Sequence, residues 1–156
     1  MNRRGFLVAG FLLTPLAAAL SACGRTATGP EGMVEFKWDR DTCARCSMVI
    51  SDRRFAAQIR GGEKQQAFKF DDIGCAVIWM HNKQQDTPWI KDAATRFWVA
   101  DITSSGDKWL EARAAHYSGG KVSPMAYNQG ATAYPGPGAM DFEEMRQHVL
   151  AKGRPS

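Results

Sequence analysis

The chain has 156 residues, of which 44% are apolar and 23% are charged, and its formal net charge is +4 at pH 7. These proportions are ordinary for a globular domain. Two basic residues, Arg3 and Arg4, lie in an N-terminal leader, so the rest of the chain is nearly neutral, which excludes the basic footprint of a nucleic-acid-binding protein. Without the leader, about 130 residues remain, enough for one hydrophobic core and one domain.

The N-terminus has the pattern of a signal peptide, predicted over residues 1–22. A positively charged start precedes an apolar run over residues 6–20, which is too short for a comfortable membrane-spanning helix. The run ends in Leu-Ser-Ala-Cys, which resembles a bacterial lipobox and predicts a lipid on Cys23. The alternative is an ordinary signal peptide cleaved near Ala22. The arginine pair leaves export by the Sec and Tat routes equally open.

We therefore expect an exported lipoprotein that is anchored in a membrane and faces the periplasm. Residues 23–32 contain Gly, Pro, Thr and Ala without an apolar period, which predicts a flexible tether. The folded domain is then expected at 33–156.

The mature chain alternates strand and helix patterns. Segments with alternating or β-branched and aromatic residues predict four strands, at 33–38, 55–59, 66–70 and 97–102. The middle two form a hairpin around Gly61-Gly62. Helical spacing follows an Asp71-Asp72 start as far as about His81, and again from an Asp141 cap through Val149. Residues 109–117 fit either helix or strand.

This order of elements predicts an α+β fold with a largely antiparallel sheet and packed helices. The stretches 119–127 and 134–138 are rich in Gly and Pro and predict loops.

One short segment carries most of the chemistry. Cys43, Cys46 and Met48 bring three sulfur atoms within six residues. Thiolate and thioether ligands select Cu(I) over hard ions, and alternate residues of an extended chain point the same way, so Cys46 and Met48 could share one ion. Met125, after Ser-Pro in a predicted loop, lies outside any periodic apolar face and is a further candidate ligand.

Other roles for the cysteines remain open. A Cys43–Cys46 disulfide is the usual expectation in an oxidising compartment, and a thiol–disulfide oxidoreductase using this pair is the alternative function. A c-type haem would need His where Ser47 stands, and a structural zinc site would need a second ligand pair. Cys75, in the first predicted helix, is interpreted as a small core residue rather than a ligand.

No catalytic signature is visible, and we expect a protein that is not an enzyme. Asp71 and Asp72 are interpreted as helix-start acids rather than as a catalytic carboxylate pair, and neither a nucleophile elbow nor a phosphate loop is found. His116, near the second loop, could add an imidazole ligand, although an exposed or capping histidine is the simpler interpretation.

Four motifs in order resemble the NosL family, whose members are copper-binding lipoproteins accessory to nitrous oxide reductase. The motifs are Asp-x-Cys-x-x-Cys-x-Met at 41–48, Arg-Phe-Ala-Ala-Gln at 54–58, Phe-x-Phe-Asp-Asp-Ile-Gly-Cys at 68–75, and Ser-Pro-Met at 123–125. The resemblance runs from Cys23 to about Met125. It implies a Cu(I) metallochaperone built from two small ββαβ-like units.

The resemblance also implies a ligand set. Cys46 and Met48 are the expected first ligands and Met125 the third, while Asp41, Cys43 and His116 are secondary candidates. Ser47 and Ala126 stand where the family usually has glycine, which leaves the coordination number open. The implied copper acceptor is nitrous oxide reductase or another copper-accepting assembly protein. A homodimer that shares ligands across its interface would also complete the site.

Overall fold

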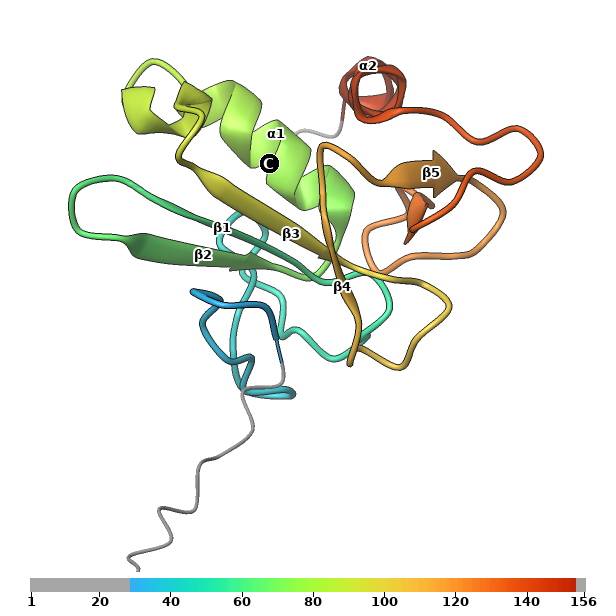
Figure 1. Ribbon diagram of the computed structural model, residues 1–156, viewed down its shortest axis with the longest axis horizontal. Helices are drawn as coiled ribbons and strands as arrows, with labels where there is room; N and C mark the ends of the chain where they lie inside the picture. Colours follow the sequence, from blue (N-terminus) through green and yellow to red (C-terminus); the bar gives the residue numbers. More distant parts are fainter. Residues whose placement is uncertain (1–28, 154–156) are drawn as a thin grey trace, which may run out of the picture.

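The computed structural model describes residues 29–153, which form an α+β fold with open antiparallel sheets (Figure 1). The predictions for the signal peptide, for Cys23 and for most of the tether lie outside these residues. No helix within residues 29–153 has the length and apolar character needed to cross a membrane. The end of the expected tether, 29–32, forms a bend and a turn, closed by a hydrogen bond from Met33 N–H to Pro30 O.

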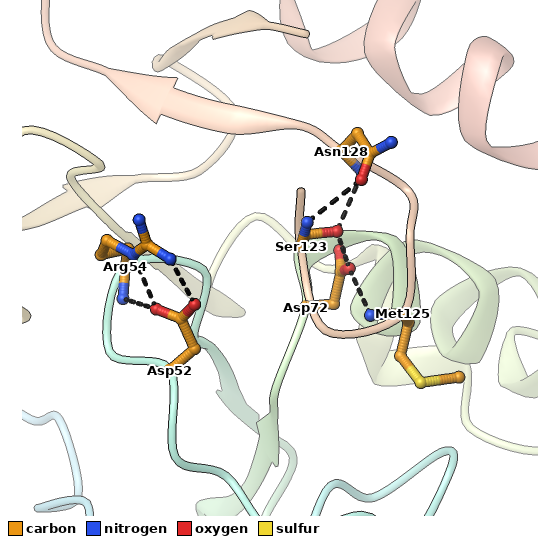
Figure 2. Close-up of polar contacts among 6 residues, drawn as sticks. All are labelled: Asp52, Arg54, Asp72, Ser123, Met125 and Asn128. Carbon is orange, nitrogen blue, oxygen red and sulfur yellow. Dashed lines mark hydrogen bonds and ion pairs between the residues drawn. The ribbon is translucent and has the colours of Figure 1, made fainter. Parts of the chain in front are cut away.

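The larger sheet has four antiparallel strands in the order β2-β1-β3-β4. These are β1 (Ala57–Gly61), β2 (Gln66–Phe70), β3 (Arg96–Ala100) and β4 (Trp109–Glu111). The hairpin prediction is confirmed, with Ala57 opposite Phe70. The first strand of this hairpin, predicted to begin at residue 55, begins two residues later, at Ala57. Residues 52–55 instead form a turn in which Arg54 makes an ion pair with Asp52 at 2.7 Å (Figure 2).

Helix α1 (Ile73–Lys83) follows β2 directly and covers one face of this sheet (Figure 1). Its first seven residues are buried, and α2 (Phe142–Lys152) packs against it. The Asp141 cap is confirmed, with a capping box to Glu144. Of the expected Asp71-Asp72 start, Asp72 is the cap and accepts a hydrogen bond from Gly74 N–H, while the first turn of α1 contains no acidic residue.

The chain after β4 builds a smaller unit. Residues 109–117, whose pattern fits either helix or strand, contain β4, a turn and the start of β5 (His116–Ser118). Strand β5 pairs with β6 (Gly130–Thr132), and α2 follows. The order β1-β2-α1-β3 is ββαβ, with a short 3₁₀ helix at Pro88–Lys91 in the crossover, whereas the second unit is a hairpin and a helix within the described residues.

The strand predicted at 33–38 is wrong. These residues are irregular, because their backbone groups bond to side chains rather than to another strand. The Gln58 amide accepts from Val34 N–H at 2.8 Å and donates to Val34 O at 2.7 Å, and Asp41 accepts from Lys37 N–H. Phe36 is buried by stacking on Trp109, with ring centroids 5.1 Å apart. The alternation of apolar residues at 33–38 therefore results from aromatic packing and not from pairing with a neighbouring β-strand.

Candidate metal centre

Three thiols and one carboxylate converge where β2 meets α1. The ligand atoms of Cys43, Cys46, Asp71 and Cys75 all lie within 4.8 Å of one another. Cys46 Sγ lies 3.5 Å from Asp71 Oδ2 and 3.6 Å from Asp71 Oδ1. This is a donor set of three soft sulfurs and one oxygen, and thiolates of this kind bind Cu(I), zinc or iron–sulfur clusters.

A tight loop presents two of these thiols. Thr42 and Val49 form an antiparallel bridge, Cys43 N–H donates to Met48 O at 2.8 Å, and Ser47 N–H donates to Cys43 O at 2.9 Å. The loop is attached to the sheet by Ala44 N–H, which donates to Lys69 O at 2.8 Å. The backbone bonds therefore hold Cys43 and Cys46 next to the end of β2, which leads into Asp71.

The other two members of the cluster come from the start of α1. Asp72 caps the helix, so Asp71 is the last residue before the cap and Cys75 lies in the first turn. Gly74, between them, has no side chain because a Cβ there would lie 2.1 Å from the Tyr127 ring. Close packing of Tyr127 on this first turn fixes the helix, and with it Cys75, against the loop that carries Cys43.

The side chains of the cluster differ in their exposure to solvent. Cys75 is fully buried and Cys43 is 2% exposed, while Cys46 is half-buried. Met48, two residues further along, is 58% exposed. An ion in the cluster would thus have protected thiols on one side and one partly accessible thiol on the other.

The three thiols differ in their pKa values. A hydrogen bond from the Cys75 thiol is the main cause that lowers the pKa of Cys43 to about 4. The same bond, followed by burial, raises the pKa of Cys75. Burial raises the pKa of Cys46 to about 12 and that of Asp71 to about 6. Cys43 is therefore the thiol of the cluster that loses its proton most readily, whereas Cys46 and Cys75 hold theirs more firmly.

Arg45 supplies positive charge beside the cluster. Its Nη1 lies 3.8 Å from Cys75 Sγ, and the residue is half-buried. Thiolates in the cluster would carry negative charge, which a guanidinium at this distance offsets. Arg45 therefore favours a filled site that contains thiolates.

A second loop is fastened to the same helix start (Figure 2). The buried carboxylate of Asp72 accepts hydrogen bonds from the Ser123 hydroxyl and from Met125 N–H, the latter at 3.2 Å. Ser123 and Asn128 close the loop, since Ser123 N–H donates to Asn128 Oδ1 and Asn128 N–H donates to Ser123 Oγ. The Met125 loop is thereby held at the residue next to Asp71.

The other residues singled out from the sequence lie in different settings. Asp41 makes an ion pair with Lys69 at 2.6 Å and accepts from Lys37 N–H. Burial opposes its ionisation, but these hydrogen bonds lower the pKa of Asp41 overall. His116 lies in β5 opposite Thr132, and neither it nor Asp41 belongs to the ligand cluster found in residues 29–153. Met48 and Met125 remain predicted ligands.

Sequence patterns alone do not reveal two members of the cluster. The interpretation of Cys75 as a core residue is incomplete. Its side chain is buried, yet its sulfur also lies within 4.8 Å of the other two thiol sulfurs, close enough for all three to bind one metal ion. The interpretation of Asp71 as a helix-start acid also falls short, because Asp72 is the cap and Asp71 faces Cys46. The available signal is the order Asp-Asp-x-x-Cys: once Asp72 is the cap, Cys75 falls in the first helical turn, beside the preceding Asp71.

Both loops contain a residue in a conformation that favours glycine. Ser47 has φ of 62° and Ala126 has φ of 57°. An L-residue here costs roughly 1–2 kcal/mol, part of which is offset by the greater chain entropy that glycine loses on folding. These are the two positions at which the sequence departs from the glycines of the motif it resembles.

We expect Ala126→Gly to raise the free energy of unfolding by about 0.5–1 kcal/mol, since it removes this strain. Ala133→Gly is the matched control: Ala133 is an exposed loop residue without a positive φ, and its replacement should lower stability. Urea denaturation measures both. Equal destabilisation by the two changes would contradict the strain argument.

The comparisons with known proteins place the fold. No family model matches the sequence, and no curated protein matches it. Among solved structures, the chain is similar to the crystal structure of the copper chaperone NosL from Shewanella denitrificans, with a TM-score of 0.50 and 12% sequence identity. The match covers 78% of this chain and 89% of that chain. At this identity the likeness shows that the two share a fold.

Proposed function

We propose that this chain binds Cu(I) at the Cys43–Cys46–Cys75 cluster and carries it to an acceptor protein. The observation that carries the proposal is the convergence of three thiols and the Asp71 carboxylate within 4.8 Å, with only Cys46 partly open. The shared fold with a copper chaperone supports copper as the metal.

Three sulfurs and one oxygen would also suit Zn²⁺, which takes tetrahedral sites of Cys, His and carboxylate ligands. One feature favours Cu(I). Thioethers are soft ligands that suit Cu(I), and the sequence places Met48 two residues after Cys46 and Met125 in the loop fastened to Asp72.

The exposure of the site fits a carrier rather than a store. Release by ligand exchange needs a position that an incoming ligand can reach, and the half-buried Cys46 with the exposed Met48 offers one. An acceptor thiol or imidazole would approach from this side. No covalent chemistry is asked of the protein, and the proposal is a transfer function and not an enzymatic one.

For the acceptor, we propose nitrous oxide reductase or another copper-accepting assembly protein. The motifs that resemble the NosL family and the fold shared with one NosL structure support this choice. The signal-peptide and lipobox patterns support an exported, membrane-anchored carrier that meets its acceptor in the periplasm.

Thiol protection tests the metal site. The reduced full chain, with Cys23→Ser so that only the cluster thiols remain, is given one equivalent of Cu(I) or Zn²⁺ and then alkylated. Trypsin cuts after Arg40, Arg45 and Lys69, so Cys43, Cys46 and Cys75 fall in three different peptides. We expect Cu(I) to protect Cys46 and Cys43. Full alkylation of Cys46 with Cu(I) bound would refute the assignment, and protection by Zn²⁺ alone would identify a zinc site.

The affinity for Cu(I) should rise with pH. Burial raises the pKa of Cys46 to about 12, so binding must displace its proton, whereas Cys43, with a pKa of about 4, is already a thiolate. Displacement of one proton predicts about a tenfold gain in affinity per pH unit between roughly pH 7 and 9, and two displaced protons would give about a hundredfold. Competition titrations across this range measure the slope. A pH-independent affinity would show that Cys46 gives up no proton on binding, and would leave the Cys43 thiolate and the thioethers as the ligands.

A further inference from the structure

The three cluster cysteines also form an arrangement suited to thiol–disulfide exchange. All are free thiols in the described part of the chain, and their sulfurs lie within 4.8 Å of one another. Free thiols persist poorly in an oxidising compartment, where neighbouring pairs are converted to disulfides. The geometry determines which pair reacts.

Access selects the first thiol. Cys43 and Cys75 are 2% and 0% exposed, so a bulky disulfide cannot reach either sulfur without displacing the loop. Cys46 is half-buried on the open side of the same loop. The Cys46 thiol donates a hydrogen bond to Asp71 Oδ2, which lies 3.5 Å from Cys46 Sγ.

Backbone geometry selects the second thiol. Cys43 and Cys46 lie within one turn, which Ser47 N–H closes on Cys43 O at 2.9 Å. Side-chain rotation alone brings two such sulfurs together, because the Cα atoms of a single turn are close enough for a disulfide. Cys75 lies on a buried helix turn packed against Tyr127, so its sulfur is less able to move.

We propose that Cys46 and Cys43 exchange with an external disulfide and thereby close the metal site. The Cys46 sulfur attacks one sulfur of R–S–S–R, forms a mixed disulfide and releases R–S⁻, while the Cys46 proton is lost to solvent and a proton from solvent is taken up by that R–S⁻. The Cys43 thiolate then attacks the Cys46 sulfur, forms the intramolecular disulfide and releases the second R–S⁻. One thiol and one thiolate of the protein are oxidised, one external disulfide is reduced to one thiol and one thiolate, and no other reactant is needed.

The effect of this disulfide on metal binding rests on the proposed function. The disulfide removes two of the three soft ligands, so loading would require prior reduction by a dithiol protein or small-molecule thiol. The disulfide exchange itself depends only on the positions of the thiols. The exchange and the Cu(I) carrier function can therefore be refuted independently of each other.

Oxidised glutathione is the probe. The full chain with Cys23→Ser, reduced and free of metal, is incubated with it, quenched with acid and digested without reduction. Cleavage after Arg45 distinguishes a Cys43–Cys46 bond from any bond to Cys75, which lies in peptide 70–83. We expect a Cys43–Cys46 disulfide in the wild-type sequence and in the matched control Cys75→Ser. In Cys43→Ser, glutathione should remain on Cys46, and Cys46→Ser should react at least tenfold more slowly.

Three results would overturn the proposal: a wild-type chain that stays reduced, a bond to Cys75 as the main product, or a Cys46→Ser variant oxidised at the wild-type rate. Should a variant fail to fold, brief alkylation of the native wild-type chain still decides, since Cys46 must be labelled before Cys43 and Cys75. Cu(I) binding is then measured before and after reduction. A disulfide that forms in a chain without Cu(I) affinity would refute the carrier function and leave the exchange standing.

Discussion

Cys46→Ser should lower the affinity for Cu(I) on the order of a thousandfold while leaving the fold intact. Groups that only support a metal ligand typically change affinity by about 10–100-fold when they are replaced, so loss of a direct ligand should cost more. A thousandfold loss corresponds to about 4 kcal/mol. Cys46 is half-buried, and its replacement by serine removes little packing, so the free energy of unfolding should change by less than about 1 kcal/mol.

Competition with a chromophoric Cu(I) chelator measures the affinity, and urea denaturation measures the stability. Cys23→Ser is the matched control, since it removes a cysteine whose predicted role is lipid attachment and not metal binding. It should bind as the wild-type chain does. Wild-type affinity in Cys46→Ser would remove Cys46 from the site, and an equal loss in Cys23→Ser would show that the effect is not specific to the cluster.

Asp72→Ala should lower the free energy of unfolding by more than the loss of an ordinary helix cap does. Its carboxylate caps α1 and also accepts from the Ser123 hydroxyl and Met125 N–H. Loss of a cap costs about 0.5–2 kcal/mol, and each buried donor left without a partner adds about 1–3 kcal/mol. Burial raises the pKa of Asp72, so the cost of desolvating the carboxylate offsets part of this. The expected net loss is about 2–4 kcal/mol.

Asp141→Ala provides the matched control, because Asp141 caps α2 at an exposed position and bonds only within its own capping box. It should cost about 1 kcal/mol. Urea denaturation compares the two variants. If Asp72→Ala cost no more than Asp141→Ala, the carboxylate would not be holding the Met125 loop. A loosened loop should also weaken Cu(I) binding, though less than Cys46→Ser does.

The sequence is informative wherever local patterns decide the structure. The hairpin around Gly61-Gly62 and the helices after Asp72 and Asp141 follow from turn chemistry and capping, which act over a few residues. The strand prediction for 33–38 fails because the alternation there serves aromatic stacking and the Gln58 side chain, which lies more than twenty residues away.

The site divides in the same way. Cys43 and Cys46 can be recognised from the sequence, because two cysteines three residues apart in one turn are necessarily close in space. Cys75 and Asp71 are not, since their proximity to Cys46 depends on how α1 docks on the loop, about thirty residues later in the chain. A buried cysteine in a helix looks the same in sequence whether its sulfur faces packed side chains or another thiol.

The most direct test of the carrier function is an anaerobic Cu(I) titration of the reduced full chain, with Cys23→Ser, against a chromophoric competitor. The proposed site predicts one tightly held equivalent, unaffected by excess Zn²⁺ and weakened when Arg45, 3.8 Å from Cys75 Sγ, is replaced by Gln. Failure of the reduced chain to withdraw copper from the competitor would contradict the carrier function, and the cluster would then be a set of thiols whose chemistry is redox alone.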